Sequence, residues 1–509
     1  MARGALTLLR GGAVIDGTGK PRFRGDVLIE GDRIAEVGKV AAPADAQVVD
    51  CKGMVVAPGF VDVHSHSDLQ AIEGRREKLL QGVTTEIVGN CGFSAFPSPA
   101  RRNLLHEFAN GIFCGTGDWG WPSAREYLEA ARSSPTATVA PLVGHGTLRV
   151  AVAGFQNGPL EEKQVEQMEK LLDEALAAGA AGFSTGLMYA PGSTAPFWEL
   201  ERLCRVVAKR DKVYATHMRD YFGGVVDAIE EQLKLVRSTG VRLQISHLQV
   251  VGASNWGLQT KALDTIEKAE RIHGGVNVCF DCYPYTAGST VLTQILPPWT
   301  MEGGVDEMVK RLKDPQLRPR ITAQIHNWIA WRWTDIYISA VGGDPKHPAV
   351  GKNLAELAAG GKTSPTEVVF DLLVEHRGAV NMLTFNQSEG NLRGTLRHPL
   401  SFIGSDGFYV RGRPHPRLHG TFPRLLGTIC RDKGWMNLEP AIWKITSGPA
   451  ERFRIKDRGR LAPGYFADVT VFDPQTIDSP ATYEEPEKPP VGIHRVFRNG
   501  KELLGPKSV

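Results

Sequence analysis

Strand-like and helix-like stretches alternate through the middle of this 509-residue chain, and this alternation restricts the fold more than any other feature. Several of the intervening segments have helical periodicity, most clearly 160–178 and 222–238. The strand candidates are Phe60–His66, Thr84–Cys91, Ala137–His145, Ala180–Leu187, Val213–His217, Arg242–His247, Val276–Tyr283 and Phe402–Asp406. Alternating β and α units indicate a parallel sheet, and eight of them predict an α/β fold with a closed, TIM-like (β/α)₈ barrel.

One long segment does not fit a simple βα repeat. The stretch 287–375 is long for a single connection, and it contains Pro297-Pro298-Trp299 and a charged helical piece near Met308–Lys313. A ninth strand candidate, Asn381–Phe385, competes for a place in the barrel, and we assign it to an excursion. We therefore expect an inserted lid or wall over the barrel mouth at about 287–375.

Both chain ends have the pattern of a β-meander, with short apolar runs separated by turn sequences such as Asp16-Gly17 and Asn499-Gly500. Neither 1–58 nor 458–509 has enough residues for a good core of its own. We expect the two ends to pack together as one small β-sandwich beside the barrel, which takes 59–457.

Composition narrows the class of protein. Hydrophobic residues make up 42% and charged residues 23%, as in ordinary globular proteins. The formal charge of +3 comes without a basic stripe interleaved with aromatic residues, so we expect no nucleic-acid partner. No apolar run reaches the roughly 20 residues of a membrane span, and the N-terminus has too short an apolar core for a signal peptide. Seven cysteines without framework spacing favour a reducing cytoplasm. The sequence leaves open whether the protein forms a homo-oligomer.

A pair of histidines stands at the end of the first predicted strand. Side chains alternate faces along a strand, so His64 and His66 point the same way. Two imidazoles on one face of a strand end can hold one divalent metal ion. The motif alone is a moderate indication, because most histidines in proteins are not metal ligands.

Further residues that could bind a metal ion or transfer a proton stand where other predicted strands end. They are Cys91, His145, His217, His247, Tyr283 and Asp406. Taken alone, each has an ordinary explanation: Cys91 can be a buried thiol, His217 can cap a loop, and Asp406 can cap a helix. Active sites of (β/α)₈ barrels lie at the C-terminal ends of the strands, however. The joint occurrence therefore favours a metal site at one mouth.

The set of donors indicates the metal and its chemistry. Imidazole, thiolate and carboxylate together suit Zn²⁺. A thiolate at Cys91 would offset part of the metal charge and could bridge two ions. Zn²⁺ lowers the pKa of bound water and polarises a carbonyl group, which is the chemistry of amide or ester hydrolysis without a protein nucleophile. Asp406 could take the proton from the water and give it to the leaving amine.

Several segments resemble one enzyme family. The run Val55–His66 resembles the opening strand of the amidohydrolase superfamily, and Ala462–Asp468 resembles its closing segment. More narrowly, the chain resembles the N-acyl-D-amino-acid deacylases, or D-aminoacylases. The matching segments are Gly89–Ser94, Gly186–Tyr189, Thr216–Arg219, Ser246-His247, Tyr283–Thr290, Gly404–Gly407 and His415–Arg417. Hydantoinase-like and dihydroorotase-like relatives usually carry a carbamylated lysine on the fourth strand, and Gly182–Gly186 offers none.

The resemblance implies roles for matching positions in a zinc centre. One zinc ion would be tightly bound, and a second, weaker site would share Cys91. The ligands of the first site would be Cys91, His217 and His247. The second site would add His64, His66 and Asp406. Asp406 would be the general base and acid.

The resemblance also implies a site for the substrate α-carboxylate, formed by Arg417, Tyr283 and Ser289. A planar guanidinium can bind a carboxylate through two hydrogen bonds. Tyr189 would line the pocket or polarise the scissile carbonyl. Alternatives stay open: Arg417 could form a surface or interdomain ion pair, Tyr283 could be a buried aromatic residue, and Ser289 could lie in a turn. His145 is either a group near the pocket or a loop histidine without substrate contact.

One departure from the family pattern bears on the substrate. Many members carry His-Lys after the sixth-strand histidine, whereas this chain has Leu248-Gln249. The lysine would be a cation close to the substrate. Tryptophans 299, 328, 331 and 333 in the inserted segment suggest an apolar wall instead. We therefore expect a small N-acyl-D-amino acid, or a related amide, with an apolar group.

Two other functions remain open on the sequence. The chain could be a hydrolase of the same superfamily that acts on a dipeptide, a cyclic amide or a xenobiotic amide. It could also be a non-catalytic barrel with a binding role, although the complete donor set argues against that. The preference for the D-enantiomer comes wholly from the family resemblance.

Overall fold

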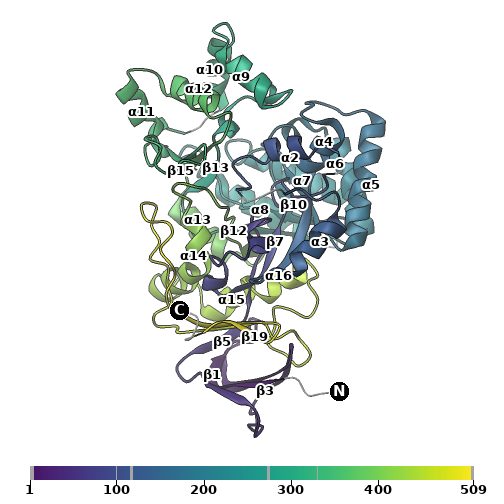
Figure 1. Ribbon diagram of the computed structural model, residues 1–509, viewed down its shortest axis with the longest axis vertical. Helices are drawn as coiled ribbons and strands as arrows, with labels where there is room; N and C mark the ends of the chain where they lie inside the picture. The colour runs from purple at the N-terminus through teal and green to yellow at the C-terminus, as the bar shows by residue number, and fades with distance from the viewer. Residues whose placement is uncertain (1–4, 99, 115–118, 272–275, 329–330, 506–509) are drawn as a thin grey trace.

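The computed structural model describes residues 5–98, 100–114, 119–271, 276–328 and 331–505, except for the side chains of 327 and 328. The barrel occupies the middle of the molecule (Figure 1). A sheet built from both chain ends lies below the barrel in this view, and an inserted region, teal to green, lies above it (Figure 1).

The barrel consists of eight parallel strands in the spatial order β16-β12-β11-β10-β9-β8-β7-β6. They are β6 (Phe60–Asp62), β7 (Val83–Val88), β8 (Thr138–Gly144), β9 (Gly182–Gly186), β10 (Val213–His217), β11 (Arg242–Ile245), β12 (Val278–Cys282) and β16 (Ser401–Ile403). All eight predicted strands are therefore confirmed; β10 has the predicted bounds, and the other seven are shorter than expected. The predicted (β/α)₈ fold is correct.

The first and last strands meet just beyond their carboxyl ends. Ser65 and Gly407 form a parallel β-bridge, and the amide of Asp406 donates to the carbonyl oxygen of His64 at 2.7 Å. Asp62 supports this contact from below, because its Oδ1 accepts the amide of Ser405 at 2.8 Å. The contact closes the barrel and brings the segments of His64, His66 and Asp406 together.

Helices cover the outside of the barrel (Figure 1). They are α1 (Gln70–Glu73), η1 (Leu79–Gln81), α2 (Arg102–Phe108), α3 (Ala124–Arg132), α4 (His145–Ala153), α5 (Glu162–Ala178), α6 (Phe197–Lys209), α7 (Val225–Thr239), α8 (Leu258–Arg271) and α13 (Glu389–Arg397). In α5, a capping box of Glu161 and Gln164 starts the helix, and Gly179 ends it with φ = 118°. Helices α5 and α7 confirm the two clearest helical predictions.

The two chain ends form one eight-stranded sheet, in which β4 lies beside β1 off the main order β19-β18-β17-β5-β1-β2-β3. Its strands are β1 (Leu6–Val14), β2 (Phe23–Glu30), β3 (Arg33–Gly38), β4 (Gln47–Asp50), β5 (Val55–Pro58), β17 (Val469–Phe472), β18 (Ile493–Arg498) and β19 (Lys501–Leu504). Antiparallel pairing of β5 with β17 joins the N-terminal and C-terminal parts. The two ends thus share one core, as expected from their small size.

An apolar cluster fixes this sheet to the barrel. Val55 and Phe472 of the sheet pack in it with Phe60 of the barrel and Phe422. Four helical segments after β16 contribute further apolar side chains to this region. They are α14 (Arg417–Arg424), η6 (Leu425–Asp432), α15 (Leu438–Lys444) and α16 (Ser447–Arg452).

The inserted region has a small antiparallel sheet of its own, in the order β13-β15-β14. Its elements are β13 (Gly288–Val291), η3 (Leu292–Ile295), η4 (Pro298–Met301), α9 (Val305–Lys313), α10 (Arg318–Trp328), η5 (Trp333–Asp335), β14 (Ile336–Val341), α11 (Leu354–Gly361), α12 (Pro365–Glu375) and β15 (Val380–Thr384). The ninth strand candidate is β15, which lies outside the barrel as predicted. No helix in the described ranges combines the length and apolarity needed to cross a bilayer.

Barrel closure can be tested through Asp62. Its carboxylate accepts the Ser405 hydroxyl at 2.6 Å and pairs with the buried ammonium group of Lys78. Replacing Asp62 with alanine leaves that ammonium group buried without its partner, so we expect the free energy of unfolding to fall by about 3–5 kcal/mol. Urea unfolding measures this loss. The control Asp264→Ala removes an exposed carboxylate of α8 and should change it by less than about 0.5 kcal/mol. Equal stabilities of the two variants would contradict the role of Asp62.

Candidate metal centre

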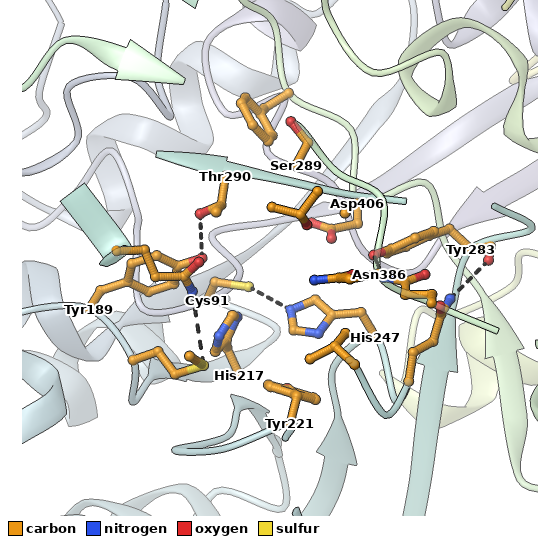
Figure 2. A pocket seen from close by; sticks show the side chains of 18 of the residues that line it. Cys91, Tyr189, His217, Tyr221, His247, Tyr283, Ser289, Thr290, Asn386 and Asp406 are labelled. Atoms are coloured by element: carbon orange, nitrogen blue, oxygen red, sulfur yellow. Dashed lines mark hydrogen bonds between the residues drawn. The ribbon is translucent and has the colours of Figure 1, made fainter. Parts of the chain in front are cut away.

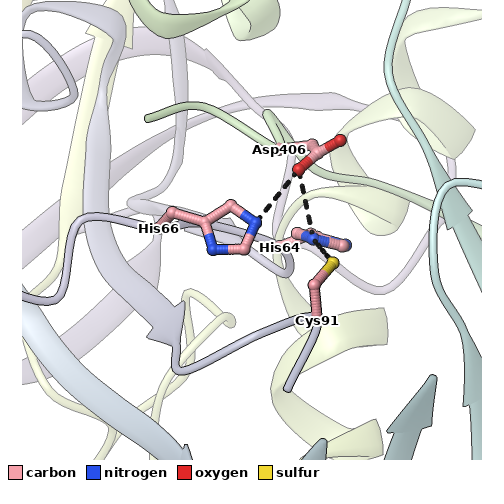
Figure 3. A group of neighbouring side chains, drawn as sticks. All are labelled: His64, His66, Cys91 and Asp406. Atoms are coloured by element: carbon pink, nitrogen blue, oxygen red, sulfur yellow. Dashed lines mark hydrogen bonds and ion pairs between the residues drawn. The ribbon is translucent and has the colours of Figure 1, made fainter. Parts of the chain in front are cut away.

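The six predicted metal donors converge at the carboxyl end of the barrel in two groups that share Cys91. Within each group, the potential ligand atoms all lie within 4.8 Å of one another. The first group is His64, His66, Cys91 and Asp406 (Figure 3). The second group is Cys91, His217 and His247 (Figure 2). His64 and His66 follow β6 and Asp406 follows β16, with six strands between these two in the barrel order, so only closure of the barrel can bring these donors this close.

The backbone is unusual at three of these donors. Cys91, His247 and Asp406 have φ values of 52°, 37° and 48°, a left-handed conformation that non-glycine residues seldom adopt. Each stands directly after, or within a few residues of, the end of a barrel strand. Such conformations persist only where the surrounding structure enforces them, and they are concentrated at functional sites.

Within the first group, neighbouring donor atoms lie at about hydrogen-bonding distance. The Cys91 sulfur lies 3.4 Å from Nε2 of His64, and Oδ1 of Asp406 lies 3.3 Å from Nε2 of both His64 and His66 (Figure 3). In the second group, the same sulfur lies 3.5 Å from Nε2 of His247. The donor atoms therefore face common points rather than separate partners.

Asp281, a residue that the sequence analysis missed, orients two of the histidines. Its Oδ1 lies 3.0 Å from Nδ1 of His64 and accepts the amide of His247 at 2.8 Å. Its other oxygen accepts the side-chain amide of Gln244 at 3.0 Å. A carboxylate on the far nitrogen of a histidine fixes the ring and leaves the other nitrogen to face a metal. The position of Asp281 inside the apolar run of β12 could have indicated this buried role.

Some of the donor atoms have no partner within the protein. Both ring nitrogens of His217, and Nδ1 of His66, are buried without a hydrogen-bond partner among the described residues. Burial lowers the pKa of His217 to about 3, so its imidazole is neutral and has a free lone pair. Buried polar atoms without partners are costly, and a bound cation would satisfy the lone-pair nitrogen of His217.

The protonation of Cys91 separates two kinds of chemistry. Burial raises the pKa of its thiol to about 11, against the opposing effect of the nearby His64. A cysteine nucleophile needs a lowered pKa, because the thiolate is the reactive form. Cys91 therefore does not have the setting of a nucleophile, whereas a metal ion deprotonates a coordinating thiol.

Opposite charges govern the protonation of Asp406 and His64. Burial alone would raise the pKa of Asp406, but the guanidinium of Arg417 and the nearby His64 hold it well below its usual range. Burial opposes the charged form of His64 as well, yet the carboxylates of Asp281 and Asp406 keep its pKa well above the ordinary value. Asp406 is thus ionised at neutral pH.

A pocket of about 710 Å³ opens over the two groups, and three of the four predicted substrate residues line it: Tyr189, Tyr283 and Ser289. The hydroxyl groups of Tyr189 and Thr290 lie 2.9 Å apart, and the Tyr283 hydroxyl accepts from the side chain of Gln387 at 3.0 Å. Ser289 lies in β13, not in a turn. Figure 2 shows Tyr189 and Tyr283 on opposite sides of the histidines.

Arg417 lies behind the pocket wall and is only 1% exposed. One of its nitrogens is 3.0 Å from Oδ2 of Asp406, and another donates to the carbonyl oxygen of Ser289 at 3.3 Å. Its guanidinium carbon lies 4.5 Å from the centre of the Tyr283 ring. Among the described residues, the structure thus pairs Arg417 with Asp406 inside the site rather than with a surface or interdomain carboxylate.

Two further pocket residues were missed from the sequence. Tyr221 stands between two predicted ligands, with ring centres 5.1 Å from those of both His217 and His247. Its hydroxyl accepts the amide of Met218 and donates to the carbonyl oxygen of Ser246. Asn386 follows β15, lines the pocket and has no side-chain partner among the described residues. Neither position carries a motif that would have identified it.

His145 does not line the pocket. Its Nε2 lies 2.8 Å from a carboxylate oxygen of Glu199, which also binds Arg149, and all three side chains are buried. The histidine thus belongs to a buried polar network in the barrel wall. Of the two interpretations of His145, a role without substrate contact is the one that this geometry supports.

The expected tryptophan wall is only partly present. Trp331 lines the pocket, whereas Trp299 and Trp333 pack against the core of the inserted region. The side chain of Trp328 lies outside the described part. Apolar side chains from the barrel loops also line this pocket. They are Phe93, Ile112, Met188, Phe222 and Val251.

Comparisons with known proteins agree with this geometry. Residues 47–503 match the model of the amidohydrolase family. The chain is 37% identical over 501 residues to D-aminoacylase of Alcaligenes xylosoxydans xylosoxydans, covering 97% of this chain and 93% of the relative. It is also 37% identical over 499 residues to N-acyl-D-glutamate deacylase of the same organism, covering 97% and 92%.

A solved structure is similar along nearly the whole chain. It is the N-acyl-D-glutamate deacylase of Bordetella bronchiseptica, complexed with zinc and a phosphonate inhibitor that mimics the tetrahedral intermediate of the reaction. The TM-score is 0.83 at 35% identity, and the match covers 98% of this chain and 96% of the other.

The role of Asp281 can be tested by metal affinity. In Asp281→Ala the His64 ring and the His247 loop lose their common anchor, so we expect zinc affinity to fall about 10–100-fold. Competition with a chromogenic chelator measures this loss. Glu199→Gln, which alters the buried carboxylate of the His145 network, is the matched control and should keep the wild-type affinity. If both variants bind zinc as the wild type does, Asp281 does not orient the metal site.

Proposed function

Because the chain belongs to the amidohydrolase family and, within it, to the D-aminoacylases, we propose that it hydrolyses N-acyl-D-amino acids to a carboxylic acid and a D-amino acid. The observation that carries this proposal is the convergence of two donor groups on Cys91 beneath a pocket into which the ionised Asp406 faces. The relatives favour an N-acyl-D-amino acid substrate over the dipeptide, cyclic-amide and non-catalytic alternatives.

The donor set fits zinc. Cys91, His217 and His247 would hold one ion tightly, and His64, His66 and Asp406 would form a weaker site with the same sulfur. The two unpartnered nitrogens of His217, and the soft and hard donors on one face, support this assignment. When bound, Zn²⁺ supplies a Lewis acid that polarises a carbonyl group and lowers the pKa of water.

Asp406 would move the proton during hydrolysis. Its Oδ1 faces the two groups of donors, and its Oδ2 is held by Arg417 at 3.0 Å. Since the carboxylate is ionised at neutral pH, it can accept a proton from the attacking water at Oδ1. It would then return that proton to the leaving nitrogen, so that the amine departs neutral.

Two substrate contacts follow from the pocket walls. The substrate α-carboxylate would lie towards Tyr283 and Ser289, because the Arg417 guanidinium lies behind that end of the pocket and its Nε has no hydrogen-bond partner among the described residues. Tyr189 would donate to the scissile carbonyl oxygen from the opposite side. Burial raises the pKa of the Tyr189 hydroxyl, so it keeps its proton and can act as a donor.

Gln249 indicates which side chains the pocket accepts. It is buried, its side-chain nitrogen donates to the carbonyl oxygen of Tyr283 at 3.3 Å, and its oxygen has no partner among the described residues. No lysine or arginine lines the pocket within the described ranges. A D-glutamate side chain would therefore bury a carboxylate without a cation, whereas Phe222, Val251 and Trp331 suit an apolar group.

Location and assembly are parts of the same proposal. All seven cysteines are free, which supports a reducing cytoplasm. The homo-oligomer stays a prediction.

The proton-transfer role of Asp406 gives a direct test of hydrolysis. In Asp406→Asn we expect turnover of N-acetyl-D-leucine to fall by at least about 100-fold, because the carboxamide cannot accept the proton. The tightly held zinc should remain, since Asp406 is not one of its three proposed ligands. Initial rates and elemental analysis measure both effects, with Asp264→Asn as the control. Wild-type turnover in the Asp406 variant would remove this residue from its role.

Substrate preference tests the neutral pocket. Among N-acetyl derivatives of D-leucine, D-methionine, D-phenylalanine and D-glutamate, we expect the apolar three to have the higher kcat/KM. In Gln249→Lys, kcat/KM for the glutamate derivative should rise at least about tenfold, because a hydrogen bond to a charged group contributes ~1.5–3 kcal/mol. Gln249→Met, which has a similar size and no charge, should not produce that rise. A wild-type preference for the glutamate derivative would defeat the apolar assignment.

A further inference from the structure

A second cavity, here called the side chamber, adjoins the active-site pocket. It contains about 660 Å³ of space, and the two spaces share five wall residues, so at most one layer of side chains separates them. The shared residues are Phe93, Ile112, Met188, Tyr189 and Gln294.

The side chamber lies between the barrel loops and the inserted region. Its walls come from α2, from the segment after β9, and from the segment between β13 and α9. Hydrogen bonds fasten the two parts around it. The amide of Gly303 donates to the carbonyl oxygen of Phe155 at 3.3 Å. The side-chain nitrogen of Asn381 donates to the carbonyl oxygen of Gly111 at 2.7 Å. The chamber is therefore formed in advance of any ligand.

The walls of the side chamber are mainly apolar, and its two charged residues already have partners. Glu107 accepts the amide of Val305, and Arg377 pairs with Asp306 at 2.7 Å. Both charged side chains are therefore already engaged within the protein. The remaining side chains suit a hydrocarbon. The apolar wall residues are Phe93, Phe108, Ile112, Phe155, Met188, Ala190, Val291, Leu296, Pro298, Met301 and Val305.

The position of the side chamber indicates which part of the substrate would enter it. It shares Tyr189 with the pocket, whereas Tyr283 and Ser289 line the pocket alone. Figure 2 shows Tyr189 and Tyr283 on opposite sides of the histidines. An N-acyl amino acid whose charged end lies near Arg417, with its amide over Cys91 and His217, directs its acyl group towards Tyr189.

We infer that the side chamber binds the acyl chain of the substrate, and that the preferred substrates are N-acyl-D-amino acids with an extended aliphatic acyl group. This inference rests on the proposed function and adds a chain-length preference to it. Met188 and Gln294 form the movable part of the shared wall: the Gln294 side-chain nitrogen lies 3.9 Å from the Met188 sulfur. An unbranched methionine side chain changes rotamer readily and can make way for a chain.

Chain length in the wild-type enzyme is the first test. With zinc-loaded protein, kcat/KM is measured for N-acetyl-, N-butyryl-, N-hexanoyl- and N-octanoyl-D-leucine. We expect kcat/KM to rise about two- to fourfold per added methylene, as transfer of a methylene group from water implies. Values that stay level or fall along the series overturn the inference. If the acetyl derivative is hydrolysed, that failure leaves the proposed function intact; if no member is hydrolysed, the proposed function itself fails.

A substitution inside the side chamber is the second test. Thr293 is partly exposed to this space and does not line the active-site pocket. In Thr293→Phe the added ring occupies the space, so the ratio of kcat/KM for the octanoyl derivative to that for the acetyl derivative should fall at least about tenfold. Thr293→Val, which has the same shape without the hydroxyl group, should keep the wild-type ratio. An unchanged ratio in Thr293→Phe overturns the inference.

The third test separates the acyl chain from the amino-acid side chain. N-acetyl derivatives of D-alanine, D-norvaline and D-2-aminooctanoate lengthen the side chain instead of the acyl group. In Thr293→Phe their relative kcat/KM values should follow those of the wild type. If the variant loses activity selectively on the longest of these side chains, the chamber holds the side chain and the assignment to the acyl group is wrong.

Discussion

The contact between the first and last barrel strands is the constraint on which the site depends. A bridge between Ser65 and Gly407 joins segments more than 340 positions apart, and the amide of Asp406 donates to the carbonyl oxygen of His64. Below the contact, the buried carboxylate of Asp62 accepts from Ser405 and pairs with Lys78. Without closure, the donors of the first group would stand at opposite edges of an open sheet.

Buried charge then sets the properties of each donor. Asp281 and Asp406 approach His64 from its two ring nitrogens, and Arg417 keeps Asp406 ionised. His217 lacks any such carboxylate partner and is neutral. Histidines in one small site thus differ because of their buried neighbours rather than their exposure. The pKa of His64 is raised and that of His217 is lowered, in agreement with the proposal that His217 belongs to a group of neutral donors and that the group of His64 includes the proton carrier, Asp406.

The inserted region contributes part of the walls around this site. Its strand β13 supplies Ser289 to the pocket, and the segment that follows builds a wall of the side chamber. The barrel supplies the reactive groups, whereas the pocket walls come from both parts.

The sequence alone predicted the barrel, its eight strands and the donor residues that gather at its mouth, because hydrophobic periodicity marks strands and because strand ends of a parallel barrel share one mouth. The sequence also showed that Gln249 stands where many family members have a lysine, which removes a positive charge near the substrate. Only the tertiary structure decided the roles of Asp281, Tyr221 and Asn386 and the left-handed backbone at Cys91, since each depends on neighbours distant in the chain. The same holds for Arg417, whose motif indicates a carboxylate but does not say that Asp406 lies 3.0 Å away. Periodicity is a local property of a chain, whereas a contact across a closed barrel is not.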